Sequence, residues 1–180
     1  MVYLKLIGQT QVKLVEVILN STGQFIKIME GKLMRAVVQR VSKAKVKVKG
    51  ETIGKIGAGL VILLGIGEED TSKEVKYLGD KILNLRIFGD QNDKMNLSAL
   101  DQGADLLVVP NFTLYGDCSQ GRRPDFNKAA SPDKAEKLYK EFVQVVDNSE
   151  LTVKTGRFKA MMDVELINDG PVTLVIDTDD

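Results

Sequence analysis

The sequence contains no histidine and no tryptophan, and Cys118 is its single cysteine. Without histidine, a Ser-His-Asp triad, a Cys-His pair and any imidazole-ligated metal site are all excluded. A single cysteine also excludes an intramolecular disulfide and a four-cysteine zinc site, and it favours a reducing compartment. If the protein is an enzyme, we expect its proton transfers to come from other side chains, from water or from the substrate.

Long apolar runs and a net charge are also missing. The most apolar stretch, residues 59–67, is too short for the ~18–20 residues of a membrane span, and the N-terminus lacks a signal-peptide pattern. We therefore expect a cytoplasmic protein without membrane association.

The 25 basic and 25 acidic residues cancel, yet residues 35–49 contain six basic side chains and no acidic one: Arg35, Arg40, Lys43, Lys45, Lys47 and Lys49. This block is either a solvated strand face or a contact surface for a polyanion.

The chain has 180 residues, of which 43% are hydrophobic and 28% charged, as expected for one folded domain. Its first 33 residues differ from the rest, since two short strand patterns at 11–19 and 24–29 flank a turn at 20–23. We expect residues 1–33 to form an N-terminal extension, either a peripheral hairpin or the product of a start codon upstream of the true one. The domain itself is expected to span 34–180.

From Met34 onward the pattern predicts many strands and two main helices. Thr71 and Glu74 have capping-box spacing, which starts a helix over 72–88. A second helix begins at Ser131, with Pro132 in its first position. Strands are expected at 34–41, 45–49, 52–56, 60–64, 104–109, 151–154, 164–167 and 172–176. Runs of strands with two interspersed helices favour an α+β fold with mostly antiparallel pairing.

Several features that could carry chemistry have simpler explanations. The glycine pairs at 57–59 and 65–67 lack the third glycine of a dinucleotide-binding loop, and they fit strand-end turns better. The loop carboxylates Asp117, Asp125 and Asp133 are scattered and are better explained as solvated. Cys118 has no histidine to activate it, so it is interpreted as an incidental thiol.

Two short segments stand apart from the rest. The sequence Pro110-Asn111-Phe112-Thr113-Leu114 lies where a buried strand runs into a loop, which is a common place for functional groups. The sequence Asn168-Asp169-Gly170-Pro171-Val172-Thr173 separates two predicted strands. Taken singly, the first fits a strand-to-loop turn and the second a hairpin turn.

Together with other motifs in the same order, these segments point to a known family. The stretch from MRAVVQRV through IGKIGAGL, LRIF, KMNLS, NFTLYGD, GRRPDF, ASPDKAEKLY, TGRF and NDGPVT resembles the D-aminoacyl-tRNA deacylases, also called D-tyrosyl-tRNA deacylases. The resemblance covers Met34 to about Thr178. It implies a barrel-like core and a cytoplasmic homodimer that uses neither metal nor cofactor. It also implies hydrolysis of the ester between a D-amino acid and the 3′ end of tRNA, with aminoacyl-tRNA rather than DNA as the partner.

The resemblance also assigns roles to residues of the first segment. The family motif Ser-Gln-Phe-Thr-Leu corresponds to residues 110–114, where Pro110 and Asn111 depart from it and the last three residues match. By this comparison, Asn111, Phe112 and Thr113 form the catalytic segment, whose backbone holds the terminal adenosine and the oxyanion. Either the substrate's own 2′-OH assists the hydrolysis or the Thr113 hydroxyl acts as the nucleophile. No obvious base for Thr113 is found in the sequence, which favours the 2′-OH.

The second segment matches its family motif in full. The resemblance implies a cis Gly170–Pro171 bond in a turn that enters the partner subunit's site and rejects L-amino acids there. Arg40 is expected to support this turn, while Phe158 and Met162 are expected near the pocket. A rigid backbone wall would discriminate by clash with an L side chain and would tolerate many D-amino acids. Because glycine is achiral, glycyl-tRNA is expected to pass the filter and be cleaved as well.

Two other functions remain open from the sequence. A related family that edits L-alanine mischarged onto noncognate tRNA carries proline at the position of Pro110, although its second motif differs from the one here. The departure at Pro110 and Asn111 is also compatible with a tRNA-binding module that has lost catalysis. Assays with D-tyrosyl-tRNA and mischarged L-alanyl-tRNA would separate these alternatives.

Overall fold

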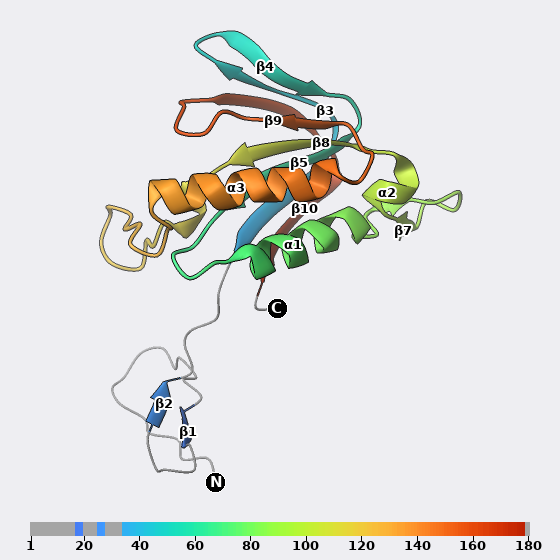
Figure 1. Cartoon of the computed structure of the whole chain (residues 1–180). Coiled ribbons are helices and arrows are strands. Elements are labelled where there is room, and N and C mark those ends of the chain that lie inside the picture. The colour runs from blue at the N-terminus through green and yellow to red at the C-terminus, as the bar shows by residue number, and fades with distance from the viewer. Residues whose placement is uncertain (1–16, 20–24, 28–33, 179–180) are drawn as a thin grey trace.

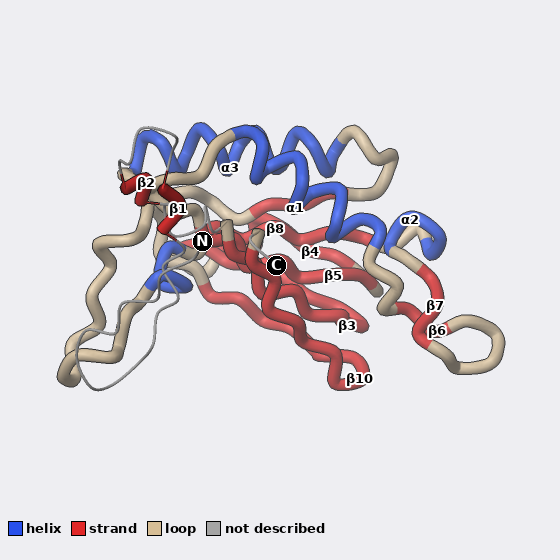
Figure 2. The backbone as a smooth tube through the Cα atoms, turned by 90° about the horizontal axis from the view of Figure 1, so that it is seen from below, coloured by secondary structure: helices blue, strands red, loops and turns tan. Residues whose placement is uncertain are grey.

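The computed structural model describes residues 17–19, 25–27 and 34–178. A six-stranded mixed sheet is covered on one face by helices, as Figure 1 and Figure 2 show. Its strands are β3 (Arg35–Val48), β4 (Glu51–Ile56), β5 (Gly59–Gly65), β8 (Asp105–Pro110), β9 (Val153–Thr155) and β10 (Asp163–Asp177). The order is β10-β3-β5-β8-β9, and β4 pairs with the second half of β3. Strand β8 is parallel to both β5 and β9, while β3 is antiparallel to β10, β4 and β5.

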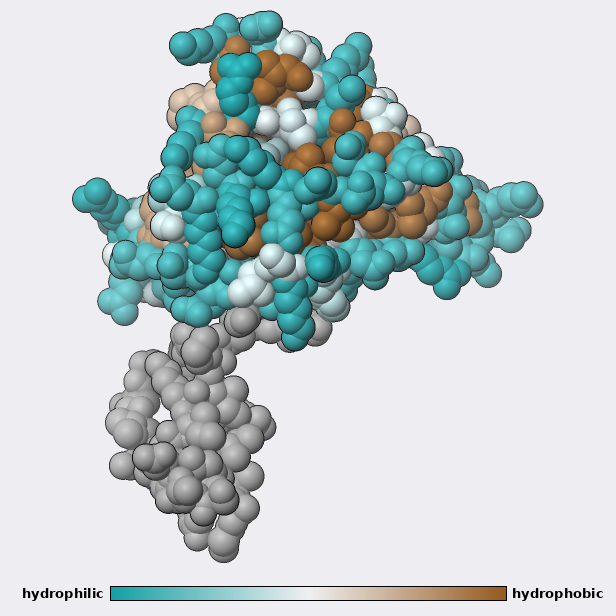
Figure 3. All heavy atoms as spheres, viewed as in Figure 1, coloured by the Kyte–Doolittle hydropathy of each residue, from teal (hydrophilic) through white to brown (hydrophobic). Residues whose placement is uncertain are grey.

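Helices α1 (Ser72–Asn84) and α3 (Pro132–Asp147) pack side by side on the sheet (Figure 2). The shorter elements are the helix α2 (Ala99–Gln102), the 3-10 helix η1 (Phe112–Tyr115) and the strand pairs β1–β2 and β6–β7. These strands span Val17–Leu19, Phe25–Lys27, Phe88–Gly89 and Met95–Leu97. Over α1 and α3, Figure 3 shows hydrophobic atoms only between hydrophilic side chains, as expected of amphipathic helices.

Hydrophobic side chains fill both faces of the sheet. One core lies between the sheet and the helices and includes Leu60, Ile62, Leu78 and Phe142, all fully buried. A smaller core on the other side contains Val41, Ala44, Val46, Ile56, Val61, Leu107 and Val109. Strand β4 covers it and approaches β9, since a Cβ on Gly54 would lie 3.0 Å from the Thr155 carbonyl oxygen. The sheet therefore curls into a nearly closed barrel.

The α+β class with a barrel-like core and two main helices is confirmed, although two parallel pairings make the sheet mixed. The Thr71 capping box is present, because the Thr71 N–H donates to Glu74 Oε2 at 2.8 Å. The helix that it starts ends at Asn84 rather than 88, since Leu85 is already extended with ψ of 123°. As predicted, Ser131 precedes α3, whose first residue is Pro132.

The hairpin turn predicted at 168–173 is wrong. The two strands predicted around it form one long strand, β10, which pairs with β3 on both sides of the interruption. Asn168 pairs with Val41 and Thr173 with Gln39, so five steps along β10 match only two along β3. The surplus residues leave the ladder as a bulge, because β3 continues to offer partners beyond it.

At the N-terminal end, Val17–Leu19 pairs with Phe25–Lys27 in antiparallel fashion, in the predicted strand pair. The remaining parts of those predicted strands and the turn between them lie outside the described residues. The boundary between the extension and the domain at Met34 stays a prediction. Among the described residues, no helix is long and apolar enough to cross a membrane.

Candidate active site

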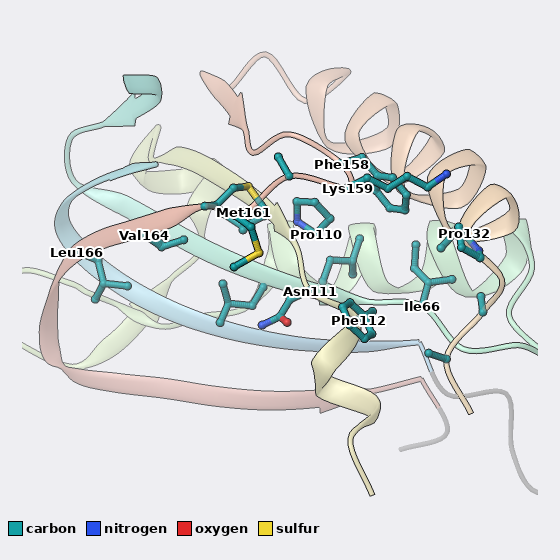
Figure 4. A pocket seen from close by; sticks show the side chains of 18 residues that line it. Ile66, Pro110, Asn111, Phe112, Pro132, Phe158, Lys159, Met161, Val164 and Leu166 are labelled. Carbon is teal, nitrogen blue, oxygen red and sulfur yellow. The ribbon is translucent and has the colours of Figure 1, made fainter. Parts of the chain in front are cut away.

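A pocket of about 810 Å³ opens where β8 leaves the sheet and enters η1. Asn111 and Phe112 border it at the start of η1, and Phe158 and Lys159 lie across from them in Figure 4. Its remaining lining is mostly apolar: Leu63, Leu64, Ile66, Val109, Pro110, Ala129, Ala130, Pro132, Ala135, Ala160, Met161, Met162, Val164 and Leu166. The pocket is thus hydrophobic, with few polar groups at its mouth, which is typical of sites that hold an organic ligand.

The 3-10 helix η1 presents Phe112 and Thr113 beside this pocket. Strand β5 fixes its start, because the Asn111 N–H donates to the carbonyl of Leu64 in that strand at 2.8 Å. The Asn111 side chain does not cap η1. Its Oδ1 instead accepts the Thr113 hydroxyl proton at 2.5 Å. Phe112 is 60% exposed and packs edge-on against Phe126, with the ring centroids 5.2 Å apart.

Two glycines at the end of β5 make room for η1. A Cβ on Gly65 would lie 3.1 Å from both Leu114 and Tyr115, and one on Gly67 would lie 2.9 Å from the Tyr115 hydroxyl. The glycine pair at 65–67 therefore ends a strand, as predicted, and also permits the close approach of η1. Arg35 also holds η1, because its Nη1 donates to the Leu114 carbonyl at 3.1 Å.

A carboxyl group is buried directly behind η1. Asp70 is 0% exposed, and its Oδ2 accepts the Gly67 N–H at 2.6 Å. Burial raises the pKa of Asp70 to about 6, with a smaller contribution from the Glu74 charge, while the Gly67 N–H and Lys134 act in the opposite direction. Burial also raises the pKa of the Tyr115 hydroxyl, and the charge on Asp70 adds to this rise.

The bulge of β10 carries the second predicted segment. The Gly170–Pro171 peptide bond is cis, and Gly170 has a φ of +129°, which L side chains rarely adopt. Asn168 closes the base of the bulge, because its Nδ2 donates to the carbonyls of Arg40 at 2.9 Å and Val172 at 3.0 Å.

Arg40 lies under the same bulge. Its Nε is 3.0 Å from Asp169 Oδ2, and its Nη1 donates to the Ile87 carbonyl at 2.5 Å. A Cβ on Gly170 would come within 3.2 Å of Arg40 Nη2 and 2.8 Å of the Val172 nitrogen. Arg40 therefore ties the bulge to the body of the domain.

The predicted site residues thus form two groups within one chain. Asn111, Phe112, Phe158 and Met162 line the pocket, and Thr113 follows Phe112 in η1. Arg40, Gly170 and Pro171 are not among its lining residues, although Val164 and Leu166 of the same strand β10 are. A second hollow of about 520 Å³ lies beside Arg40 and Asp169.

Sequence reasoning missed Asp70, Tyr115 and Phe126. Tyr115 and Phe126 lie in the loop that follows the Phe-Thr-Leu motif, and no periodicity distinguishes them there. Asp70 stands between two exposed acidic residues and a helix cap, so it looks like an ordinary loop carboxylate. The one available signal was the pair of glycines at 65 and 67, which indicated close packing just before it.

The basic strand keeps its predicted alternation. Ala44, Val46 and Val48 are buried, and the lysines between them are not. Lys45 and Lys47 both pair with Glu165, at 2.9 and 2.6 Å. Hydrogen bonding to Glu165 raises the pKa of Lys47. This shared carboxylate reduces the positive charge of the face.

Cys118 is exposed, and Asp117 and Asp125 form a two-residue bridge through their backbones. Within the described ranges, no group of three or more His, Cys, Asp or Glu side chains is placed to hold a metal ion.

Comparison with known proteins relates this architecture to aminoacyl-tRNA deacylases. The chain is 58% identical over 145 residues to a D-aminoacyl-tRNA deacylase of Thermosipho africanus, covering 81% of this chain and 97% of that protein. The corresponding protein of Desulfatibacillum aliphaticivorans is 60% identical, with 81% and 99% covered.

Solved structures give the same result for the fold. The c-Myc DNA Unwinding Element Binding Protein matches with a TM-score of 0.75 and 44% identity, over 79% of this chain and 97% of that one. A probable eukaryotic D-amino acid tRNA deacylase, 17% identical, shares the fold with a TM-score of 0.70 over 81% and 99% of the two chains.

The match to a family model extends through nearly the whole domain. Residues 37–177 match the model described as D-Tyr-tRNA(Tyr) deacylase. This range includes η1, the pocket and the bulge of β10. The chain therefore belongs to the D-Tyr-tRNA(Tyr) deacylase family, and it is a hydrolase that acts on aminoacyl-tRNA.

Proposed function

We propose that this enzyme hydrolyses the ester of D-aminoacyl-tRNA, such as D-tyrosyl-tRNA, and releases the free D-amino acid and tRNA. The observation that carries the proposal is the apolar pocket bordered by Asn111 and Phe112. A pocket of this size and character suits the terminal adenosine and the amino acid attached to it. The 3-10 helix at its edge then lies beside the ester.

In this proposal, the backbone of η1 stabilises the developing negative charge on the ester oxygen. The Asn111 side chain leaves the first N–H groups of η1 uncapped, and the peptide N–H groups of Phe112 and Thr113 are the oxyanion donors. Such a donor is typically worth ~2.7–4 kcal/mol of transition-state stabilisation. Water attacks the ester carbonyl carbon, and the bond between that carbon and the ribose 3′-oxygen breaks. A proton of the attacking water passes to the leaving 3′-oxygen through the neighbouring 2′-OH.

The Thr113 hydroxyl fits a positioning role better than that of a nucleophile. It donates its proton to Asn111 Oδ1, and an amide oxygen is too weak a base to remove that proton. The hydrogen bond fixes the Thr113 rotamer and the Asn111 side chain together at the pocket edge. This geometry supports assistance by the substrate's 2′-OH.

We further propose that two copies of the chain complete each other's site. Strand β10 is an edge strand of the sheet, and it exposes Ile167 by 51% and Val175 by 63%. An edge strand with exposed apolar side chains invites pairing with a second chain. In the resulting homodimer, Gly170 and Pro171 of one subunit reach the pocket of its partner, whereas they do not line their own.

The bulge would select the D enantiomer by excluding the other one. A turn held by Arg40 and Asn168 presents rigid backbone toward the substrate's α-carbon. An L side chain would collide with that backbone, whereas a D side chain would point away from it. Glycyl-tRNA has no side chain to exclude, so we propose that it is cleaved too.

The test is a comparison of four substrates with the full-length protein: D-tyrosyl-tRNA, L-tyrosyl-tRNA, glycyl-tRNA and L-alanyl-tRNA mischarged on a noncognate tRNA. We expect catalytic release of D-tyrosine and glycine and no release of L-tyrosine. Faster turnover of mischarged L-alanyl-tRNA would replace the D-specific assignment. Stoichiometric binding of tRNA without turnover would indicate a binding module.

A further inference from the structure

The loop at residues 65–70 connects the two walls of the pocket. It packs against η1 through Gly65 and Gly67. It also holds the opposite wall, since the Ile66 carbonyl accepts the Ala130 N–H at 2.9 Å and Glu68 Oε2 accepts the Ser131 N–H at 3.0 Å. A change in this loop would therefore move both sides of the pocket.

Asp70 and Tyr115 meet at the centre of this connection. Gly67 lies between them: its N–H binds Asp70 Oδ2 at 2.6 Å, and its α-carbon faces the Tyr115 hydroxyl. Within the described part of the chain, Asp70 Oδ1 and the Tyr115 hydroxyl are both buried, and neither makes a hydrogen bond of ordinary geometry. Since both groups adjoin Gly67 and each affects the pKa of the other, they lie near each other behind η1.

Burial of a carboxyl group at this position is unfavourable for folding. A carboxylate taken out of water costs free energy unless it is fully paired, and one backbone N–H pairs only one of its oxygens. An apolar or amide side chain would fill the same space at a lower cost. Groups of this kind commonly serve function rather than stability.

We propose that Asp70 and Tyr115 form a positioning pair that holds η1 in the orientation that ester hydrolysis requires. Tyr115 is the last residue of η1, and Phe112 and Thr113 are its first two. A shift of the Tyr115 hydroxyl relative to Asp70 rotates the whole short helix and moves the oxyanion donors. Displacements near 1 Å can lower the rate of an enzymatic reaction ~100-fold.

The pair acts most strongly when Asp70 is ionised. An ionised Asp70 keeps the hydrogen bond from the Gly67 N–H and leaves its second oxygen, Oδ1, as an acceptor for the Tyr115 O–H, and charge-assisted bonds of this type are the stronger ones. Glu74 and Lys134 face Asp70 with opposite charges, and Arg35 and Asp177 act on Tyr115. Because the pKa of Asp70 is about 6, kcat should fall as the pH decreases through that value.

The experiment measures kcat and KM for D-tyrosyl-tRNA with Asp70→Asn, Tyr115→Phe and the double variant, after subtraction of spontaneous hydrolysis. We expect each single variant to lower kcat ~10-fold with little change in KM. Since the two residues act as a unit, the double variant should lose no more than either single one. Asp70→Asn should also abolish the decrease in kcat near pH 6. Glu69→Gln, an exposed neighbour, and Tyr77→Phe on α1 are the matched controls.

The inference rests on the proposed roles of Phe112 and Thr113. The outcomes distinguish a failure of the proposed function from a failure of the positioning pair. If the unmodified enzyme does not release D-tyrosine, the proposed function fails. If it does, unchanged kcat in either single variant overturns the positioning pair, as does a ~100-fold loss in the double variant. If kcat falls only in variants whose melting temperature also falls, the loss reflects stability, and this result contradicts the positioning pair as well. Should Asp70→Asn not fold, Tyr115→Phe alone decides through its kcat and KM.

Discussion

The two turns assigned to the active site are supported in opposite ways. The η1 turn is braced from within its own domain: Gly65 and Gly67 pack against it, the half-buried Arg35 donates to its Leu114 carbonyl, and Asp70 is buried behind it. The bulge at Gly170–Pro171 projects from an edge strand, and both residues are exposed. One turn is therefore positioned by its own subunit. The other is held at its base by Arg40 and Asn168, and its outer surface is exposed.

The largest effect should follow from a side chain added at the bulge. Gly170→Ala places a Cβ 2.7 Å from Val172 Cγ2 and 2.8 Å from the Val172 nitrogen, at a φ of +129°. The backbone must shift, and we expect kcat/KM for D-tyrosyl-tRNA to fall by ~100-fold or more. Gly57→Ala, which meets only ordinary contact at 3.7 Å, is the matched control. Retention of full D-specific activity in Gly170→Ala would remove the filter role.

A smaller loss is expected when the bulge keeps its sequence but loses its support. Arg40→Lys retains the positive charge, yet a lysine cannot bind Asp169 and the Ile87 carbonyl simultaneously with the planar guanidinium geometry. We expect kcat/KM for D-tyrosyl-tRNA to decrease ~10-fold and cleavage of L-tyrosyl-tRNA to become detectable. If the ratio of D to L cleavage stays the same, the bulge does not depend on Arg40.

On the η1 side, we expect the substitution Asp70→Asn to make the folded protein more stable. Asp70 has a higher pKa in the folded state than its ordinary 3.8, so the folded protein retains this proton after the unfolded chain has lost it. Stability therefore falls as the pH rises from about 4 to 6, and the cost persists above 6. An elevation to about 6 corresponds to at most ~3 kcal/mol, and because an amide accepts the Gly67 N–H more weakly than a carboxylate does, we expect Asp70→Asn to gain ~1–2 kcal/mol.

Chemical denaturation at pH 8 and pH 4 measures this difference. Asp70→Asn should be the more stable protein at pH 8 and should lose its advantage near pH 4. Glu69→Gln should show no such dependence. Equal stability of Asp70→Asn and the unmodified protein at pH 8 would mean that Asp70 is well solvated or fully paired.

A weaker effect is expected on the basic strand, which belongs to neither turn. If the face binds tRNA phosphates, removing one lysine–phosphate interaction should reduce the slope of log affinity against log salt by ~1. Because Glu165 already neutralises part of the charge, we expect Lys45→Gln with Lys47→Gln to reduce the slope by ~1 rather than ~2. An unchanged slope would show that the lysines only keep the face solvated.

The smallest effect is expected at the N-terminus. A chain beginning at Met34 retains β3, Arg40 and both turns, and Met34 itself is fully buried in the domain. We expect it to fold, to dimerise and to hydrolyse D-tyrosyl-tRNA at the rate of the full chain. A soluble, dimeric and inactive product would place residues 1–33 in the site and move the predicted domain boundary.

Local sequence patterns determined much of this protein. The Thr71–Glu74 capping box, Pro132 at the start of α3 and the alternating lysines and valines of β3 depend on neighbours in the chain, and each was predictable. The motifs around Phe112 and Gly170 identified the family for the same reason, since each is a short contiguous stretch. The excluded catalytic classes followed from the absence of histidine alone.

Only the tertiary structure decided what lies between these motifs. The continuity of β10 depends on pairing with β3, which is more than a hundred residues away in sequence, so the bulge looked like a hairpin. The burial of Asp70 depends on Tyr115 and Gly67, which meet only when β5 and η1 pack together. Its neighbours in the sequence are solvated acids, and local composition carries no trace of the burial. Sequence thus specified the residues with local partners, and packing over long separations specified the positions of the others.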